Sequence, residues 1–143
     1  GPISNISTLS QLKEIQIGNN LFSGLIPGDI GLLSELQMIE MYNNSFEGAI
    51  PSYIGELSPY FFTNWTELIS LQLQNNSLSG EIPPEIGSLT KLSYLYLYRN
   101  LLSGSIPAGI GSLENLLELD LSNNNLSGQI PTTLWNLSNL QIL

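Results

Sequence analysis

Residues 75–92 read NNSLSGEIPPEIGSLTKL, and nearly the same phrase returns twice along the chain at a spacing of 24 residues. Residues 99–116 read RNLLSGSIPAGIGSLENL, and residues 123–140 read NNNLSGQIPTTLWNLSNL. Aligned with one another, these copies define a period of the form L-x-x-L-x-L-x-x-N-x-L-x-G-x-I-P-x-x-I-G-x-L-x-x. Self-similarity at a fixed period of this length is the signature of a repeat protein, so it decides the fold before any single residue does.

The same period extends over the rest of the chain. Five near-complete copies begin at a leucine in the same position of the period: Leu12, Leu36, Leu68, Leu92 and Leu116. Residues 1–11 match the back half of an earlier copy, and residues 140–143 match the start of a later one. We therefore predict a single repeat array over residues 1–143.

Each copy contains an L-x-L core in which apolar and polar residues alternate, as in a β-strand with one buried face. A strand of only about three residues cannot fold alone, so stacking must join the leucines of successive copies into one continuous core. The asparagine that follows the strand carries both donors and acceptors, which can satisfy buried backbone groups where the chain turns inward. These asparagines predict a structural ladder formed by Asn20, Asn44, Asn76, Asn100 and Asn124.

The second half of each copy predicts irregular structure opposite the strands. Its glycine permits a tight backbone, and its proline cannot donate a hydrogen bond to a sheet. The I-G-x-L segment that follows is too short for a regular helix, so we expect irregular or 3₁₀ turns there. Leucines spaced three apart could instead mark amphipathic helices, but glycine and proline in every copy argue against that alternative.

The period breaks once, between Leu36 and Leu68, which lie 32 residues apart. One interpretation is an inserted binding loop. The other is a defect in the array, because 32 equals two periods less 16 residues and the segment before Leu68 itself matches the back half of a copy. In that match Pro59 takes the proline position and Trp65 takes the position of the last leucine. We favour the defect and expect an irregular segment at residues 58–67.

Two arrangements of this segment stay open. Either the chain makes an atypical turn with two back halves in series, or residues are skipped between Leu57 and Ser58. A continuous chain would place four aromatic residues in a bulge on the convex side: Tyr60, Phe61, Phe62 and Trp65.

Composition excludes several classes of function. The formal net charge is −9, and the cations are Lys13, Lys91 and Arg99, which argues against binding to nucleic acid or to an anionic membrane surface. The chain has no cysteine and no histidine, so it lacks a disulfide framework, the usual general base and the commonest metal ligand. We expect no cofactor and no metal. No apolar run is long enough to span a bilayer, so we expect any membrane attachment to lie downstream.

The repeat L-x-x-L-x-L-x-x-N-x-L-S-G-x-I-P-x-x-I-G-x-L resembles the plant-specific class of leucine-rich repeat. Residues 64–141 resemble ectodomains of plant leucine-rich-repeat receptor-like kinases, particularly the male-discoverer-interacting receptor kinases. The resemblance implies an α/β solenoid, a right-handed superhelix with short parallel strands on its concave face. It also implies an extracellular, N-glycosylated protein at the cell surface or in the apoplast. In full-length relatives paired cysteines close the array and a membrane span and a kinase follow, so we interpret this sequence as an internal piece of a longer ectodomain.

Function is expected on the concave strand positions, where the repeat leaves the choice of residue free. In the fourth copy Tyr94, Tyr96 and Tyr98 alternate along one strand and so face the same side, with Arg99 at the strand end. Tyrosine with arginine is the composition of a binding hot spot, although the tyrosines could instead simply pack on one another across a solvated sheet. The predicted ligand-binding residues are Tyr42, Tyr94, Tyr96, Tyr98, Arg99, Glu118 and Asp120.

Acidic residues share this predicted face: Glu14, Glu40, Glu118 and Asp120. They would attract a peptide that carries lysine or arginine, although a surface this acidic could also serve solubility. Glu118 and Asp120 could imitate the carboxylate pair of a glycosidase, but they lie on an open strand without pocket-forming segments. We therefore predict that the chain is not an enzyme.

Six N-x-[S/T] triplets are candidate glycosylation sites: Asn5, Asn43, Asn64, Asn75, Asn125 and Asn136. Asn43 and Asn75 border the predicted concave face, where glycans would shield it from large partners.

These observations predict an extracellular ligand-sensing segment of a plant receptor-like kinase, which binds a peptide or another leucine-rich-repeat ectodomain on its concave or lateral face. One alternative is a secreted inhibitor of cell-wall enzymes, a role that similar plant proteins also perform. The other is a structural protein whose uncapped ends stack head to tail into filaments. A membrane span and a kinase motif encoded beyond Leu143 would separate the first two, and light scattering would detect the third.

Overall fold

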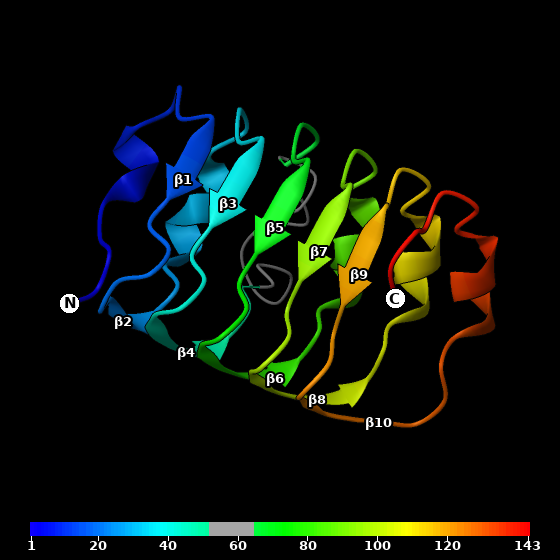
Figure 1. Cartoon of the computed structure of the whole chain (residues 1–143). Helices are drawn as coiled ribbons and strands as arrows, with labels where there is room; N and C mark the ends of the chain where they lie inside the picture. Colours follow the sequence, from blue (N-terminus) through cyan, green and yellow to red (C-terminus); the bar gives the residue numbers. More distant parts are fainter. Residues whose placement is uncertain (52–64) are drawn as a thin grey trace.

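The computed structural model describes residues 1–51 and 65–143, which form a solenoid of stacked coils with the two termini at opposite ends (Figure 1). Within these residues one parallel sheet has the strand order β1-β3-β5-β7-β9, so every strand neighbours the strand of the next copy. Its strands are β1 (Glu14–Gln16), β3 (Met38–Glu40), β5 (Ser70–Gln72), β7 (Tyr94–Tyr96) and β9 (Glu118–Asp120). The predicted leucine-rich-repeat solenoid with short parallel strands is confirmed.

The stacking stays regular across the break in the period. Met38 pairs with Ser70 in the same register in which Glu14 pairs with Met38 and Tyr94 pairs with Glu118. The extra residues therefore do not shift the strands. Most of the irregular segment expected at residues 58–67, including Tyr60, Phe61 and Phe62, lies outside the described residues, and so does the Leu57–Ser58 junction.

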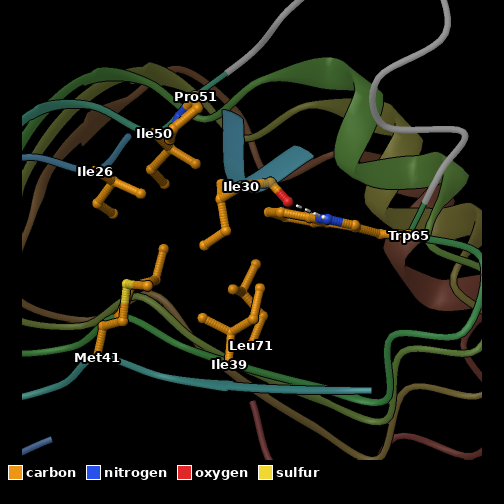
Figure 2. A pocket seen from close by; sticks show the side chains of 9 residues that line it. Ile26, Ile30, Ile39, Met41, Ile50, Pro51, Trp65 and Leu71 are labelled. Atoms are coloured by element: carbon orange, nitrogen blue, oxygen red, sulfur yellow. Dashed lines mark hydrogen bonds between the residues drawn. The ribbon is translucent and has the colours of Figure 1, made fainter. Parts of the chain in front are cut away.

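Trp65 is the described aromatic residue from this segment, and it does not lie in an exposed bulge. It is buried, and its indole N–H donates to the Ile30 carbonyl oxygen at 3.2 Å (Figure 2). Its own carbonyl accepts from the Leu68 N–H, as the Leu33 carbonyl accepts from the Leu36 N–H. Trp65 thus occupies the position of the last leucine of a copy, because its ring fills the core that this leucine fills elsewhere.

Apolar side chains from all copies form one continuous core. Beside Trp65 the core leaves a small cavity of about 10 Å³ with an apolar lining that includes Ile30, Met41 and Leu71 (Figure 2). A buried water needs a cavity of roughly this size and two or more polar partners. This apolar space belongs to the core and is too small to serve as a ligand pocket.

The convex side is built from 3₁₀ turns, as predicted. They are η1 (Ile6–Thr8), η2 (Gly28–Leu32), η4 (Pro84–Ser88), η5 (Ala108–Ser112) and η6 (Thr132–Asn136). Successive turns lie so close that a Cβ atom added at Gly87 would come within 2.5 Å of the Gly109 carbonyl oxygen. The glycine of the I-G-x-L segment is therefore needed there for backbone packing between copies.

A second parallel sheet, with the order β10-β8-β6-β4-β2, was not predicted. Its strands are β2 (Ser23–Leu25), β4 (Ser45–Ala49), β6 (Ser77–Glu81), β8 (Leu101–Ser105) and β10 (Asn125–Ser127). β2, β4, β6 and β8 each contain the glycine of the L-x-G segment, and in β10 this glycine, Gly128, directly follows the strand. Gly104, in β8, has a φ of 73°. A positive φ inside a strand bends the backbone and suits glycine, so the same residue that suggests a turn lies within a sheet.

The asparagines after the concave strands hold neighbouring copies together. The Asn76 side-chain amide donates to the Met41 carbonyl of the preceding copy at 3.0 Å and to the Leu73 carbonyl of its own copy at 3.1 Å. Its Oδ1 atom accepts from the Phe46 N–H at 3.0 Å. Matching hydrogen bonds are made by Asn44, Asn100 and Asn124. Asn20, in the first copy, donates to the carbonyls of Ile17 and Gly18.

Candidate functional site

Because the concave strands pair in register, their outward side chains form levels that run across the five copies. The Tyr94 level contains Glu14, Met38, Ser70, Tyr94 and Glu118. The Tyr96 level contains Gln16, Glu40, Gln72, Tyr96 and Asp120. The Tyr98 level, two residues further along each copy, contains Gly18, Tyr42, Gln74, Tyr98 and Ser122.

The three tyrosines of the fourth copy form one row on this face, which we call the tyrosine row (Tyr94, Tyr96 and Tyr98). The ring centroids are 6.5 Å apart between Tyr94 and Tyr96 and 6.4 Å apart between Tyr96 and Tyr98, with interplanar angles of 52° and 59°. β7 ends at Tyr96, but the backbone continues beside the fifth copy, because the Arg99 N–H donates to the Ser122 carbonyl at 2.9 Å. All three rings are half-buried, so each keeps an accessible part.

Tyr96 connects the row to the fifth copy. Its hydroxyl donates a hydrogen bond to the Glu118 carboxylate. Burial raises the pKa of Tyr96 well above its ordinary value, and the hydrogen bond and negative charge of Glu118 raise it further. Tyr96 is therefore a neutral donor at physiological pH, and its ring is held in place by a carboxylate of the neighbouring strand.

Asp120 lies next to Tyr96 on the same level. Its Oδ1 atom accepts from the Ser122 N–H at 2.9 Å, and Oδ2 has no hydrogen-bond partner among the described residues. Further along this level Glu40 accepts from the Gln72 side-chain amide at 3.4 Å. Carboxylates thus lie on the Tyr96 level in the second and fifth copies, with amide and hydroxyl groups between them.

Arg99 follows the tyrosine row, and its backbone departs from what the sequence suggested. The sequence predicts a position that the repeat leaves free, but there φ is 53° for Arg99 and between 51° and 57° in the other four copies. Those copies carry Asn19, Asn43, Asn75 and Asn123. Asparagine tolerates this left-handed conformation better than arginine does, so the position is constrained and Arg99 is the exception. Its exposed side chain makes no hydrogen bond or ion pair with a described residue.

Tyr42 does not join the tyrosine row. Gln74 lies between Tyr42 and Tyr98 on their shared level, and the Tyr42 ring covers Gly18 on the other side. A Cβ atom added at Gly18 would lie 2.7 Å from Tyr42 Cζ, so the ring fills the space that a side chain would occupy. Gln74 is 6 % exposed, and its buried Oε1 atom has no partner among the described residues. Sequence reasoning missed this orphaned acceptor, since nothing in the repeat shows that glutamine is buried there.

The candidate glycosylation sites lie at different depths. Asn5, Asn43, Asn125 and Asn136 are exposed, Asn75 is half-buried, and Asn64 lies outside the described residues. The Asn43 side-chain amide donates to Asn19 Oδ1 at 2.6 Å, so a glycan there would replace a hydrogen bond between copies.

Over the described ranges, no helix is long and apolar enough to cross a membrane. Nor do residues 1–51 and 65–143 bring together three acidic or other ligating side chains that could hold a metal ion.

The sequence matches the Leucine rich repeat family over residues 52–102, and again over residues 11–33 and 115–137. No curated protein matches the chain closely enough to count as a relative.

Solved structures provide close matches. One is the plant peptide hormone receptor RGFR1 in complex with RGF2, with 42 % identity and a TM-score of 0.88 over 96 % of this chain and 21 % of that chain. Another is the Arabidopsis receptor kinase HAESA in complex with the peptide hormone IDA and the co-receptor SERK1, with 36 % identity and a TM-score of 0.82 over 94 % of this chain and 21 % of that chain. A third is the BIR3–SERK2 complex from Arabidopsis thaliana, with 31 % identity and a TM-score of 0.77 over 93 % of this chain and 69 % of that chain. The chain therefore spans about a fifth of the two receptors and more than two thirds of the third match.

Proposed function

This chain belongs to the leucine-rich-repeat family, and from that premise we propose that it is an extracellular ligand-sensing segment of a plant receptor kinase. In this proposal residues 1–143 form a single array, without enzymatic activity, that lies at the cell surface or in the apoplast. Its ligand is a peptide or a second leucine-rich-repeat ectodomain. The similar structures of RGFR1 and HAESA contain peptide hormones, and the HAESA structure also contains a co-receptor, which supports this choice.

The observation that carries the proposal is the tyrosine row on the concave sheet. Tyrosine offers a large, rigid contact area with a hydrogen-bonding tip, and its two torsion angles cost little entropy when they are fixed. The ring spacing along the row, 6.4–6.5 Å, is close to the distance between alternate residues of a strand, about 6.6 Å, so an extended peptide laid along it would match its period. The fourth copy provides three such tyrosines in one row, so the match extends over three rings.

We assign the ligand-binding residues to this copy and its neighbour. They are Tyr94, Tyr96, Tyr98, Arg99, Glu118 and Asp120. Tyr42 is left out of this site, because it lies two copies away from the row and its ring covers Gly18. Glycans at Asn43 and Asn75 would stand on the rim of the second and third copies, whereas the corresponding positions of the fourth and fifth copies carry no N-x-[S/T] triplet. Glycosylation would therefore leave the tyrosine row open to a partner.

The test begins with a library of random dodecapeptides displayed on phage and selected against the wild-type chain. The affinity of each selected peptide is then measured for a variant with Tyr94, Tyr96, Tyr98 and Arg99 all changed to alanine. We expect at least a hundredfold loss, because the variant removes the central contact area. The matched control is Tyr42→Ala, which removes the same kind of side chain from another copy and should change affinity less than threefold.

Circular dichroism and the unfolding midpoint show whether the quadruple variant keeps its fold. Each altered residue is at least partly exposed, so we expect the array to remain intact. Peptides whose affinity survives the quadruple change would overturn the assignment of the site. Failure to select any peptide would count against a peptide-sensing role altogether.

A further inference from the structure

The concave face has a one-sided charge distribution. On the three levels defined by the tyrosine row, the five copies present the carboxylates of Glu14, Glu40, Glu118 and Asp120. None of the fifteen residues on these levels is a lysine or arginine. Because opposite charges are needed across an interface for fast and selective association, this face complements a positively charged partner.

Hydrogen-bonding capacity at the tyrosine row has the same bias. On one side of Tyr98, in the third copy, Gln74 Oε1 is a buried acceptor without a donor among the described residues. On the other side, in the fifth copy, the Ser122 N–H turns the Asp120 carboxylate toward the Tyr98 level, and Asp120 Oδ2 lacks a partner within the same ranges. An acceptor atom without a donor among the described residues therefore lies on each side of Tyr98: Gln74 Oε1 in the third copy and Asp120 Oδ2 in the fifth. Lysine and arginine are the side chains that bring several donors and no acceptor.

The rings themselves suit a cation. Successive rings of the tyrosine row are tilted by 52° and 59° relative to each other, and each tyrosine is partly exposed, so a ligand can reach the rings from solvent. A cation over the face of a tyrosine is attracted by the negative centre of the ring. Asp120 is on the next strand, about 4.8 Å away in the direction of the sheet, so a group above the Tyr96 and Tyr98 rings lies within its reach.

We infer that the fourth and fifth copies receive a lysine or arginine side chain of an extended peptide, held between the Tyr96 and Tyr98 rings and the Asp120 carboxylate. This inference rests on the proposed peptide-sensing function and names the chemistry of its ligand. Glu118 has a separate role, because its carboxylate is already engaged by the Tyr96 hydroxyl and so positions that ring. Gln74 Oε1, a buried acceptor on the Tyr98 level, is a further acceptor next to this position.

Arg99 sets the limit of this cation site. Its exposed side chain lies just beyond Tyr98 and repels a second cation there, while it can donate to a carbonyl or carboxylate oxygen of the peptide. The site therefore has hydrogen-bond acceptors beside Tyr96 and Tyr98 and the donors of Arg99 beyond Tyr98, so a bound peptide would have one preferred orientation. A bound peptide would place its cationic side chain over Asp120 and an oxygen-bearing group next to Arg99.

The experiment uses the dodecapeptides selected against the wild-type chain, resynthesised in pairs. One peptide of each pair carries its arginine, and the other carries citrulline, which has nearly the same shape without the charge. Affinities are measured by calorimetry at 50 and 300 mM salt for the wild-type chain, Asp120→Asn and Glu114→Gln. The last variant removes the same charge at an exposed position of the fourth copy, which follows η5 and lies outside the concave strands.

We expect Asp120→Asn to weaken the arginine peptide at least tenfold and Glu114→Gln to weaken it less than twofold. Citrulline should also cost at least tenfold on the wild-type chain, and Asp120→Asn should then add little, because the two changes remove the same interaction. Equal losses from Asp120→Asn and Glu114→Gln would overturn the inference in favour of a diffuse attraction by the acidic surface.

The two proposals fail in different ways. Peptides that depend on the tyrosine row but contain no enriched lysine or arginine would refute the cation site and leave the proposed function standing. Peptides that keep their affinity after the change of the tyrosine row to alanine would refute the proposed site itself, and the cation site with it. A citrulline peptide that binds as tightly as its arginine partner would refute the cation site alone.

Discussion

Two neighbouring rows of asparagine run along the solenoid, and they repeat for different physical reasons. The ladder row consists of Asn20, Asn44, Asn76, Asn100 and Asn124. The last four bond the backbone of two copies at once, whereas Asn20, in the first copy, bonds the backbone of its own copy. The rim row consists of the residues just before them: Asn19, Asn43, Asn75, Arg99 and Asn123, all with positive φ. The ladder row has no exception, whereas the rim row is interrupted at the copy that carries the tyrosine row.

The comparison shows that a hydrogen-bonding network and a left-handed backbone restrict the choice of residue to different degrees. A buried hydrogen-bonding network needs one side-chain shape, because any replacement leaves backbone groups unpaired. A left-handed backbone only prefers asparagine, and another residue can take the position at a modest cost. A residue such as Arg99, kept in spite of that cost, is where a contribution to function is expected.

The largest predicted effect is on the ladder row. Changing Asn100 to alanine removes its bonds to the carbonyls of Leu73 and Leu97 and leaves the buried Leu78 N–H without its acceptor. We expect a loss of about 3 kcal/mol in the free energy of unfolding, measured by urea titration. The matched change at Asn20, which is exposed and makes two bonds, should cost less than about 1 kcal/mol. Equal losses at the two positions would contradict the burial argument.

A smaller effect is expected in the second sheet, where glycine repeats for a backbone reason. Gly104 has a φ of 73°, and an added Cβ atom would lie 2.8 Å from Glu81 Cγ, which is part of a flexible side chain. Gly104→Ala should therefore lower the free energy of unfolding by about 1–2 kcal/mol, chiefly through the left-handed backbone. Gly104→Asn should cost less, because asparagine tolerates this conformation, and urea titration of both variants checks the order. A larger loss for asparagine would show that packing, not φ, fixes the glycine.

These rows also show how far the sequence alone could go. The ladder and the concave sheet were predictable because the leucines, the strand alternation and the asparagine recur locally in every copy. The second sheet was not, since its strands contain serine and include or adjoin a glycine with positive φ, and pairing with neighbouring copies holds them extended. The conformation of Arg99 had an available signal, namely the asparagines at its position in the other four copies.

For the site, alternation placed Tyr94, Tyr96 and Tyr98 on one face correctly. The period already places Tyr42 two copies from Tyr98, with Gln74 between them. The direction of the Tyr42 ring could not be predicted, because it depends on the missing side chain at Gly18 in the adjacent copy. The burial of Gln74 had no sequence signal either, since its position in the repeat is one where the chain also carries glycine, tyrosine and serine. Periodicity predicts which residues share a level, but the direction and burial of each side chain depend on its packing against neighbouring copies.

The rim row can be tested by changing Arg99, the residue in it that is not asparagine. Arg99→Asn restores the residue found in the other copies and should raise the free energy of unfolding by about 0.5–1 kcal/mol, because it relieves the left-handed strain. Calorimetry should show a higher unfolding midpoint for this variant. The reverse change, Asn123→Arg, introduces the exception into the fifth copy and should lower the midpoint by a similar amount. An unchanged midpoint in both variants would show that the rim position carries no dihedral preference.

The smallest effect concerns the exposed counterpart of the ladder, the bond from the Tyr96 hydroxyl to Glu118, which also joins two copies. Near neutral pH, Tyr96→Phe should cost about 0.5 kcal/mol, because the partly solvated carboxylate regains water. The pKa of Tyr96 is raised above its ordinary value of 10.0 by burial and by Glu118. The native state therefore holds the phenolic proton more tightly than the unfolded chain does, so its contribution is fully present below pH 10 and declines as the pH rises beyond that.

Urea unfolding midpoints measured at pH 7, 9, 10 and 11 test whether the contribution of Tyr96 to stability declines above pH 10. The wild-type chain should lose stability more steeply above pH 10 than Tyr96→Phe does. The control is Tyr42→Phe, which should follow the wild type because the Tyr42 hydroxyl makes no hydrogen bond with a described side chain. Because Tyr42→Phe removes one phenolic hydroxyl just as Tyr96→Phe does, the difference in slope between the two variants isolates the bond of Tyr96 to Glu118. Parallel slopes in wild type and Tyr96→Phe would show that the bond is absent in solution. The rings would then be held by packing alone, and Glu118 would be free to act beside Asp120 as a second acceptor for a cationic ligand.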